Sequence, residues 1–419
     1  MRDRKVLLVV ALLLAFAAPA HALELVRYDE ACRSTGRVSL RQTLVIVDEA
    51  LVASGPDAAV PNQRWTRALL EVADGLPGGQ RGTMNPGEQI KIFLARQEGT
   101  ELSPVFVGCS PNLSVEQRNK LEEGGSALND FFTGGAAKRI ENARKAYENA
   151  LVRSFTAISF AKQELVKQTA GKPPMPGSLL RAMASSPRLI DLSEGIPRIV
   201  VFSGFQLADK ADWPNQKAAR EAGMELATNA NVDFQRAEVH VIGFPANGSP
   251  HLKAFAEAFL LRARGLLVGW RSDGVPQLLP APTDIRVFGG TVQMGDVLAP
   301  VQVRLAVDAQ GNLVNSWIEV TTGRSLATPI SGKAICKTAD ACEVKGDGRL
   351  MGQAWNPDPG ERPVFNQQFA WSGLRYFEMS FNGNSGAVRI WDPSAKIQMG
   401  DRQMDDFKFA VQRTEHQQF

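Results

Sequence analysis

The stretch TLVIVDEALVASG, residues 43–55, carries an uncharged run that ends directly in Asp48. Such a run predicts a buried parallel strand, and this strand would deliver the carboxylate to the edge of an α/β sheet where ligands bind. A carboxylate at that position either ligates a cation such as Mg²⁺ or accepts backbone N–H bonds in the turn that follows. The first chemical question is therefore whether Asp48 holds a metal ion.

Ser203 ends a second apolar stretch, RIVVFSGF, and could act as a nucleophile if a histidine lay beside it. The chain lacks the G-x-S-x-G turn of the hydrolases that are built on related sheets. The histidine would have to be His240, in a predicted strand, or His251, in the first turn of a predicted helix. The sequence also lacks the glycine-rich loops that cradle phosphate. These patterns favour a protein that is not an enzyme.

The elements that would position these two side chains alternate between strands and helices up to about residue 275. This order predicts a doubly wound, mostly parallel sheet of six strands. An apolar stripe at helical spacing predicts a long helix from about 136 to 167, within a helical insertion at about 114–170. Ser249 is the predicted N-cap of a later helix, with Pro250 at its first position. The predicted strands are residues 42–47, 89–95, 103–108, 198–203, 237–243 and 265–269.

The segment from about residue 40 to 275 resembles the von Willebrand factor type A fold, and in particular exported bacterial members of that fold with a long helical insertion. The resemblance rests on the order of the elements and on Asp48 at the end of the first long strand. In that family the first strand ends in a D-x-S-x-S motif, which forms a metal-ion-dependent adhesion site with a later threonine and aspartate. The resemblance implies that a partner binds at the carboxyl-terminal edge of the sheet.

Measured against that motif, the metal site of this chain is degenerate. Asp48 matches the first ligand, but Ala50 and Val52 stand at the two serine positions and offer no oxygen. Ser178 corresponds to the threonine, and Ser203 is followed by glycine where the family has T-D-G. One carboxylate and one hydroxyl make a weak cage for Mg²⁺, so Asp48 and Ser178 are weak metal candidates and no cofactor is expected. The expected binding residues at this edge are Asp48, Glu49, Ser178, Ser203, Phe205 and Gln206.

The pattern changes beyond a Pro-rich linker at residues 276–283, where short alternating runs and turn signals replace the helical stretches. The alternation predicts an antiparallel β-sandwich or barrel over about 284–400. The last segment, 401–419, is polar and is predicted to be a frayed tail. The chain is therefore expected to fold as an α/β domain, residues 23–275, followed by a β domain.

Tryptophans in the predicted β domain raise a second function. Trp317, Trp371 and Trp391 lie among strand residues and are expected to pack in the core. Trp355 precedes a Pro-rich loop and is the best candidate for an exposed ring. Exposed aromatic rings stack on sugars, so carbohydrate or cell-wall binding through this domain is an alternative function.

Residues 1–22 have the three parts of a secretory signal peptide: a basic start, an apolar core and an A-x-A cleavage site. The apolar core, Val6–Ala18, is shorter than the roughly 20 residues that a membrane-spanning helix needs. The mature chain contains no later run that is long and apolar enough to span. The sequence therefore predicts a periplasmic or secreted protein.

The four cysteines form an even set in a chain that is expected to enter an oxidising compartment. Cys336 and Cys342 bracket five residues, a spacing that suits a bridged loop between two strands. Cys32 and Cys109 remain as the second expected pair. A zinc site is the alternative, and the lack of any C-x-x-C motif disfavours it.

The charge balance excludes nucleic acid as a partner. The chain carries 47 basic and 44 acidic residues, and without the signal peptide the net charge is near +1 with no basic stripe. We therefore expect a non-enzymatic exported protein-interaction module, an adaptor or subunit of a cell-envelope assembly whose partner is another envelope or secreted protein. The alternatives are carbohydrate binding through the β domain and Mg²⁺-dependent adhesion. The oligomeric state stays open.

Overall fold

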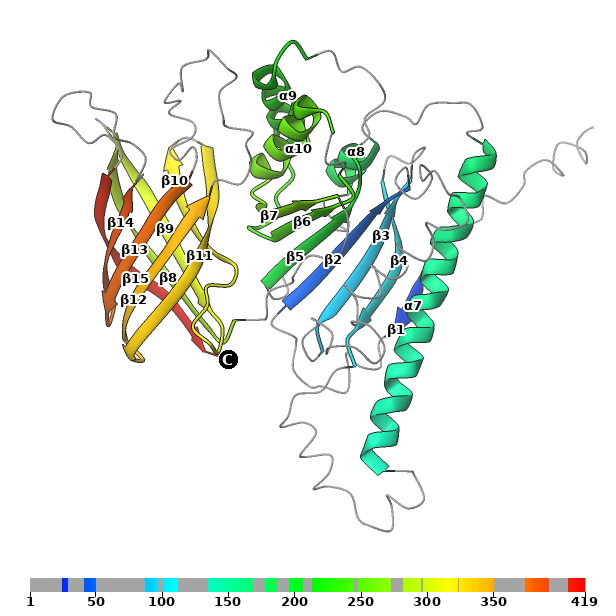
Figure 1. Cartoon of the computed structure of the whole chain (residues 1–419), viewed down its shortest axis with the longest axis horizontal. Helices are drawn as coiled ribbons and strands as arrows, with labels where there is room; N and C mark the ends of the chain where they lie inside the picture. Colours follow the sequence, from blue (N-terminus) through cyan, green and yellow to red (C-terminus); the bar gives the residue numbers. More distant parts are fainter. Residues whose placement is uncertain are drawn as a thin grey trace, which may run out of the picture.

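The computed structural model of the chain contains a mixed sheet with helices on both faces, followed by a closed β-barrel (Figure 1). We call the sheet with its helices the α/β unit. Among the described residues, none of the helices combines the length and the apolar character that crossing a membrane requires. The described residues are 25–28, 41–49, 87–96, 101–111, 135–168, 178–186, 196–205, 213–244, 248–272, 282–294, 297–322, 324–349, 374–391 and 406–418.

The sheet has seven strands in the order β1-β4-β3-β2-β5-β6-β7. Strands β3, β2, β5, β6 and β7 are parallel, β4 runs antiparallel to β3, and β1 pairs with β4 in parallel. The strands are β1 (Val26–Tyr28), β2 (Arg41–Asp48), β3 (Gln89–Ala95), β4 (Leu102–Cys109), β5 (Ile196–Phe202), β6 (Glu238–Ile242) and β7 (Leu266–Arg271).

A mostly parallel sheet is confirmed, and the six predicted strands lie within two residues of the observed bounds. The number of strands is a correction, because β1 adds a seventh at the edge. This strand has three residues, too few for any period-two pattern to stand out in the sequence. Its prediction would have required knowing that β4 offers it a free edge.

Both faces of the sheet are buried, which explains why β2 reads as one continuous apolar run. Leu44 and Ile46 face a core that includes the buried sides of three helices, α8 (Ser178–Ser185), α9 (Gln216–Asn229) and α10 (Pro250–Arg262). Val45 and Val47 face the opposite core, which the helix α7 (Gly135–Gln168) covers.

The long helix α7 docks on the sheet and confirms the predicted 136–167 helix within one residue at each end. Tyr147, Leu151, Phe155 and Ile158 of its predicted apolar stripe are buried against β1 and β4. The ring of Tyr147 meets Tyr28 edge-on at 5.5 Å between centroids. Figure 1 shows the helix running along the outer side of these strands. The rest of the predicted 114–170 insertion lies outside the described residues.

On the other face, α9 and α10 pack closely because α9 has a glycine at the crossing. A Cβ atom on Gly223 would lie 2.2 Å from the carbonyl oxygen of Phe255. Ser249 caps α10, accepting a hydrogen bond from the Leu252 amide, and Pro250 is its first residue, as predicted. The two helices therefore form one tight layer over the sheet.

The C-terminal region is a closed antiparallel barrel, which decides between the predicted sandwich and barrel. Its strands follow one another around the wall, and apolar side chains such as Phe288, Ile318, Phe377 and Val411 fill the interior. The eight strands are β8 (Asp284–Met294), β9 (Val297–Val307), β10 (Ser316–Thr322), β11 (Arg324–Thr338), β12 (Ala341–Arg349), β13 (Leu374–Asn382), β14 (Ser385–Trp391) and β15 (Asp406–Gln418).

The prediction of a frayed tail at 401–419 is wrong, because β15 pairs with β14 and β8 and closes the barrel. Phe409 and Val411 point into the interior, and Lys408 and Gln412 on either side of them are exposed. The polar outer side of an antiparallel strand accounts for the polar composition that indicated a tail. The period-two alternation was the signal that the composition obscured.

The α/β unit and the barrel share a buried interface. Trp317 of β10 packs with Leu266 of β7 and Ala327 of β11, which confirms the prediction that this tryptophan is core. Next to it, Glu319 is ion-paired with Arg236 and lies 3.6 Å from Arg264. Both apolar contacts and ion pairs therefore join the outer wall of the barrel to the α/β unit.

Candidate functional site

The carboxyl-terminal edge between β2 and β5 is the point where the strand order reverses. Counting β2 as the first strand and leaving out the extra edge strand β1, the order is 3-2-1-4-5-6. Open α/β sheets of this order bind ligands in the crevice at the reversal. Asp48 ends β2 and Ser203 follows β5, so the sheet brings both predicted residues to this place.

The two side chains contact each other directly. The Ser203 hydroxyl donates to Oδ2 of Asp48 over 2.5 Å, and the Ser203 hydroxyl oxygen accepts a bond of 2.8 Å from the Phe205 amide. The Ser203 amide donates to the Ile242 carbonyl, which fixes the residue against β6. Asp48 is 3 % exposed and Ser203 is fully buried. One oxygen of the buried Asp48 carboxylate thus accepts a hydrogen bond from a protein hydroxyl.

Phe205, expected on a binding surface, is instead buried in the core of the α/β unit. Its backbone φ of 47° lies in the left-handed region. This conformation turns the chain so that the ring points into the core. The ring lies 5.4 Å from that of Trp270 and 6.5 Å from that of Phe244. It is therefore not available to a partner in this structure.

The remaining predicted edge residues divide into two groups. Glu49 is buried beside Asp48, and Ser178 is the first residue of α8. Gln206 and the sugar-binding candidate Trp355 lie outside the described residues, as do the linker core, the signal peptide and Trp371. Within the described ranges, no three side chains of His, Cys, Asp or Glu come together as a metal site.

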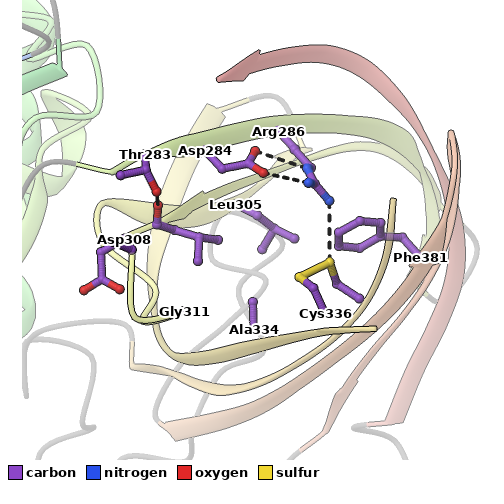
Figure 2. A pocket seen from close by; sticks show the side chains of 12 residues that line it. Thr283, Asp284, Arg286, Leu305, Asp308, Gly311, Ala334, Cys336 and Phe381 are labelled. Atoms are coloured by element: carbon purple, nitrogen blue, oxygen red, sulfur yellow. Dashed lines mark hydrogen bonds and ion pairs between the residues drawn. A yellow bond between two sulfur atoms is a disulfide. The ribbon is translucent and has the colours of Figure 1, made fainter. Parts of the chain in front are cut away.

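A cavity at one end of the barrel forms a second candidate site, which the sequence analysis did not predict. Its volume is about 340 Å³. Figure 2 shows it bounded by side chains from β8, β9, β11, β12 and β13. The lining residues are Thr283, Asp284, Arg286, Leu305, Val307, Asp308, Ala309, Gly311, Ala334, Cys336, Cys342 and Phe381.

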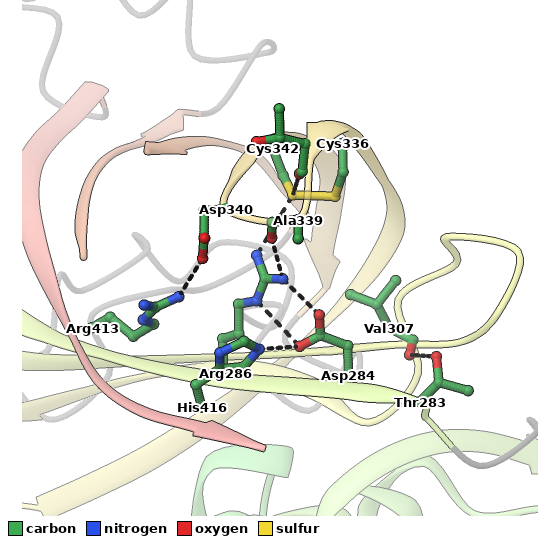
Figure 3. A network of polar contacts seen from close by, with 11 residues as sticks. Thr283, Asp284, Arg286, Val307, Cys336, Ala339, Asp340, Cys342, Arg413 and His416 are labelled. Atoms are coloured by element: carbon green, nitrogen blue, oxygen red, sulfur yellow. Dashed lines mark hydrogen bonds and ion pairs between the residues drawn. A yellow bond between two sulfur atoms is a disulfide. The ribbon is translucent and has the colours of Figure 1, made fainter. Parts of the chain in front are cut away.

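An ion pair lies at one side of this cavity. Arg286 is 4 % exposed and donates to both oxygens of Asp284, over 3.1 Å from Nε and 2.6 Å from Nη2. Nη2 also donates to the Ala339 carbonyl over 2.6 Å, and the guanidinium lies 4.9 Å above the ring of Phe381. These contacts hold the guanidinium in one orientation against the wall of the barrel (Figure 3).

Two further pairs surround the ion pair at the barrel rim. His416 Nε2 lies 3.3 Å from Oδ1 of Asp284, and Arg413 lies 3.1 Å from the carboxylate of Asp340. Figure 3 shows both beside Arg286, across the strands β8 and β15. The last strand, which was predicted as a frayed tail, therefore contributes to this end of the barrel.

The disulfide between Cys336 and Cys342 is confirmed and forms part of the cavity wall. The two residues are paired across β11 and β12, as a bridged loop between strands requires. Nη1 of Arg286 lies 3.6 Å from the sulfur of Cys342. Cys109 is also disulfide-bonded, and its expected partner Cys32 lies outside the described residues.

A cluster of buried charges occupies the amino-terminal end of the parallel strands, opposite Asp48. Arg198 lies 3.5 Å from Glu88 and 4.0 Å from Glu238, and Arg41 lies 3.8 Å from Glu238. His240 is hydrogen-bonded to Glu238 over 2.5 Å. Burial raises the pKa of Glu238, but the hydrogen bond and charge of His240 and the charge of Arg41 outweigh it, so the pKa is lowered. The cluster therefore pairs buried arginines with buried glutamates.

An aromatic pair lies on the outer face of the barrel. Tyr376 of β13 and Trp391 of β14 stack at 5.7 Å with 24° between their planes. Tyr376 is 39 % exposed, and Trp391, predicted to be core, is half-buried on the outer side. Arg389 covers Trp391 at 4.6 Å from its ring. One tyrosine face therefore remains open to solvent.

Comparison with protein-family models, with curated proteins and with solved structures gives no match.

Proposed function

We propose that the chain is a non-enzymatic, exported protein-interaction module that serves as an adaptor or subunit of a cell-envelope assembly. The observation that supports this most is the hydrogen bond from Ser203 to Asp48 at the reversal of the strand order. In the family that the sequence resembles, the corresponding carboxylate would hold an ion. Here a protein hydroxyl occupies one of its oxygens, so a partner would be bound by the surrounding surface without a bridging cation.

Thermal unfolding with and without millimolar Mg²⁺ or Mn²⁺ tests the metal-free part of this proposal. A ligand at 100 times its dissociation constant stabilises a fold by about 2.7 kcal/mol, which raises the melting temperature measurably. We expect no rise for the wild type or for Asp48→Asn. A rise in the wild type that Asp48→Asn abolishes would overturn the proposal in favour of a Mg²⁺-dependent adhesin.

Site-specific photo-crosslinking in cells tests the protein partner. Arg181 is exposed on α8, whose buried side packs in the same core as Phe205. A photoreactive residue at this position should give a discrete adduct with an envelope protein, and excess purified chain should compete with it. Lys333 is exposed on the barrel and provides the control position, where we expect no adduct. Equal labelling at both positions would contradict a partner surface at this edge.

The stacked pair on the barrel favours a second candidate, carbohydrate or wall binding. The open face of Tyr376 is the kind of platform on which a sugar ring stacks, and Trp391 and Arg389 support it from behind. Retention on purified cell-wall glycan should then be lost in Tyr376→Ala and kept in Lys333→Ala. Equal retention of the two variants would exclude this candidate.

A further inference from the structure

We propose that the cavity at the end of the barrel binds a small, largely apolar molecule that carries one uncharged oxygen acceptor. This site is separate from the edge of the α/β sheet and from the outer aromatic pair, so it does not depend on either proposed function. The volume of about 340 Å³ falls within the range of pockets that hold small organic ligands.

The walls of the cavity favour an apolar body. Leu305 and Val307 come from β9, Ala334 comes from β11, the disulfide joins β11 to β12, and Phe381 comes from β13. Figure 2 shows Phe381 beside the disulfide. Below them the interior is filled by packed apolar side chains of the barrel core. A ligand would therefore lie at the end of the barrel, against apolar surface on several sides.

Arg286 supplies the polar group that would fix the ligand. Its Nε and Nη2 atoms donate to oxygens of Asp284 and Ala339. Nη1 contacts the sulfur of Cys342 at 3.6 Å, and sulfur is a weak acceptor. Nη1 thus retains donor capacity for a carbonyl or hydroxyl oxygen of a ligand, in a hydrogen bond that the charge of the guanidinium strengthens.

The surrounding charges select against an anionic ligand. Asp284 neutralises Arg286, and Asp308 adds a second carboxylate to the lining. A ligand carboxylate or sulfonate would meet more negative than positive charge and would lose its own hydration. An uncharged ketone, ester, amide or alcohol avoids this cost and still accepts from Nη1.

The rim of the cavity is preformed by hydrogen bonds within the protein. Asp308 accepts bonds from the amides of Gln310 and Asn312 and from the Asn312 side chain, which fixes the loop between β9 and β10. Gly311 in this loop has a φ of +81°, a conformation that other residues rarely adopt. A preformed rim lowers the ordering cost of binding.

Fluorescence titration of the full-length protein with two neutral naphthalene dyes tests the site. Prodan carries a ketone oxygen, and N-phenyl-1-naphthylamine carries no carbonyl. We expect both dyes to bind saturably at one site per chain. Ala334→Phe and Val307→Phe, which place a ring in the cavity, should each weaken binding at least tenfold. Ala387→Phe, on the exposed outer side of β14, should not change it.

The oxygen acceptor is tested by Arg286→Lys, which keeps the charge beside Asp284 and removes the Nη1 donor. Prodan should bind about tenfold more weakly to this variant, and N-phenyl-1-naphthylamine should bind as before. Equal affinities of wild type and Arg286→Lys for prodan would overturn the assignment of Arg286. Absence of saturable binding in the wild type, or unchanged binding in both cavity-filling variants, would overturn the site. Tighter binding of the sulfonated dye 8-anilinonaphthalene-1-sulfonate than of prodan would overturn the choice of an uncharged ligand.

Discussion

A buried carboxylate needs hydrogen-bond donors, and Ser203 provides one for Asp48. Replacing this serine by alanine removes one hydrogen-bond donor to the buried carboxylate. We expect Ser203→Ala to lower the free energy of unfolding by about 1–3 kcal/mol, measured by urea denaturation. Ser385→Ala removes an exposed hydroxyl that contacts Gln412 and should change it by less than about 0.5 kcal/mol. Equal stability of the two variants would show that the Ser203 bond contributes little.

Glu238 makes the stability of the fold depend on pH. Its pKa is lowered from the usual 4.5, so it stabilises the folded state above that value, and this contribution is lost as the pH falls through the folded pKa. Glu238→Gln should therefore flatten the fall in stability below about pH 4.5, besides destabilising at neutral pH by breaking buried ion pairs. Unfolding titrations from pH 7 to 3 measure this. Glu221→Gln, on the exposed side of α9, should keep the wild-type slope.

The sequence predicted that Asp48 and Ser203 lie at the ends of two strands but not that they form a hydrogen bond. They are 155 residues apart, and their contact depends on β2 pairing with β5.

Arg286 was missed for a related reason. Ile285 and Val287 look like the inward residues of their strand, yet Ile285 packs with Ile196 of the α/β unit. Arg286 and Phe288 alternate with them and face the interior. Alternation defines two faces, and only the tertiary structure decides which one is the lumen.

The layer of α9 and α10 depends on Gly223. Any side chain at this position meets the Phe255 carbonyl, so Gly223→Ala should separate the helices and destabilise the fold by about 1–3 kcal/mol, in spite of the better helix propensity of alanine. Gly269→Ala is a matched control, because a Cβ there meets no atom within 4 Å. Chemical denaturation of the two variants measures the difference. An unchanged free energy of unfolding in Gly223→Ala would mean that the two helices can move apart without destabilising the fold.

Elements with a strong period or a long apolar run were predicted well. The buried strands and α7 belong to this class, and tertiary structure moves only their last residues. The barrel could not be told from a sandwich, because closure depends on the pairing of β8 with β15 and not on any local pattern. The strands β1 and β15 were missed for opposite reasons, the first for its shortness and the second for its polar side.

At the scale of the whole molecule, charged residues help to hold the two units together. Glu319 pairs with Arg236, whose guanidinium lies 4.4 Å from the ring of Trp317. Burial and the nearby charges of Arg236 and Arg41 lower the pKa of Arg304 to about 10, although Glu415 opposes the shift. Several cations therefore gather at the interface, and the buried carboxylate of Glu319 pairs with two of them, Arg236 and Arg264.

Neutralising this carboxylate should weaken the coupling of the two units. We expect Glu319→Gln to lower the melting temperature and to divide a single calorimetric transition into two, because the arginines then repel one another in a poorly hydrated space. Glu343→Gln, which breaks an exposed pair with Lys337, should leave the transition unchanged. A single, unshifted transition in Glu319→Gln would show that the apolar contacts around Trp317 suffice.

The pairing of β15 with β8 also has a consequence in time. Of the described strands β15 is translated last, about 110 residues after β8 is complete, and at roughly 5–20 residues per second this takes on the order of 10 s. Throughout that delay one edge of β8 stays without its neighbour and can pair with another nascent chain. The stability of the finished barrel does not shorten this interval. In a chain that is exported as it is synthesised, misassembly therefore depends on how fast synthesis delivers the final strand, so slow codons between residues 294 and 406 should lower the yield of folded protein.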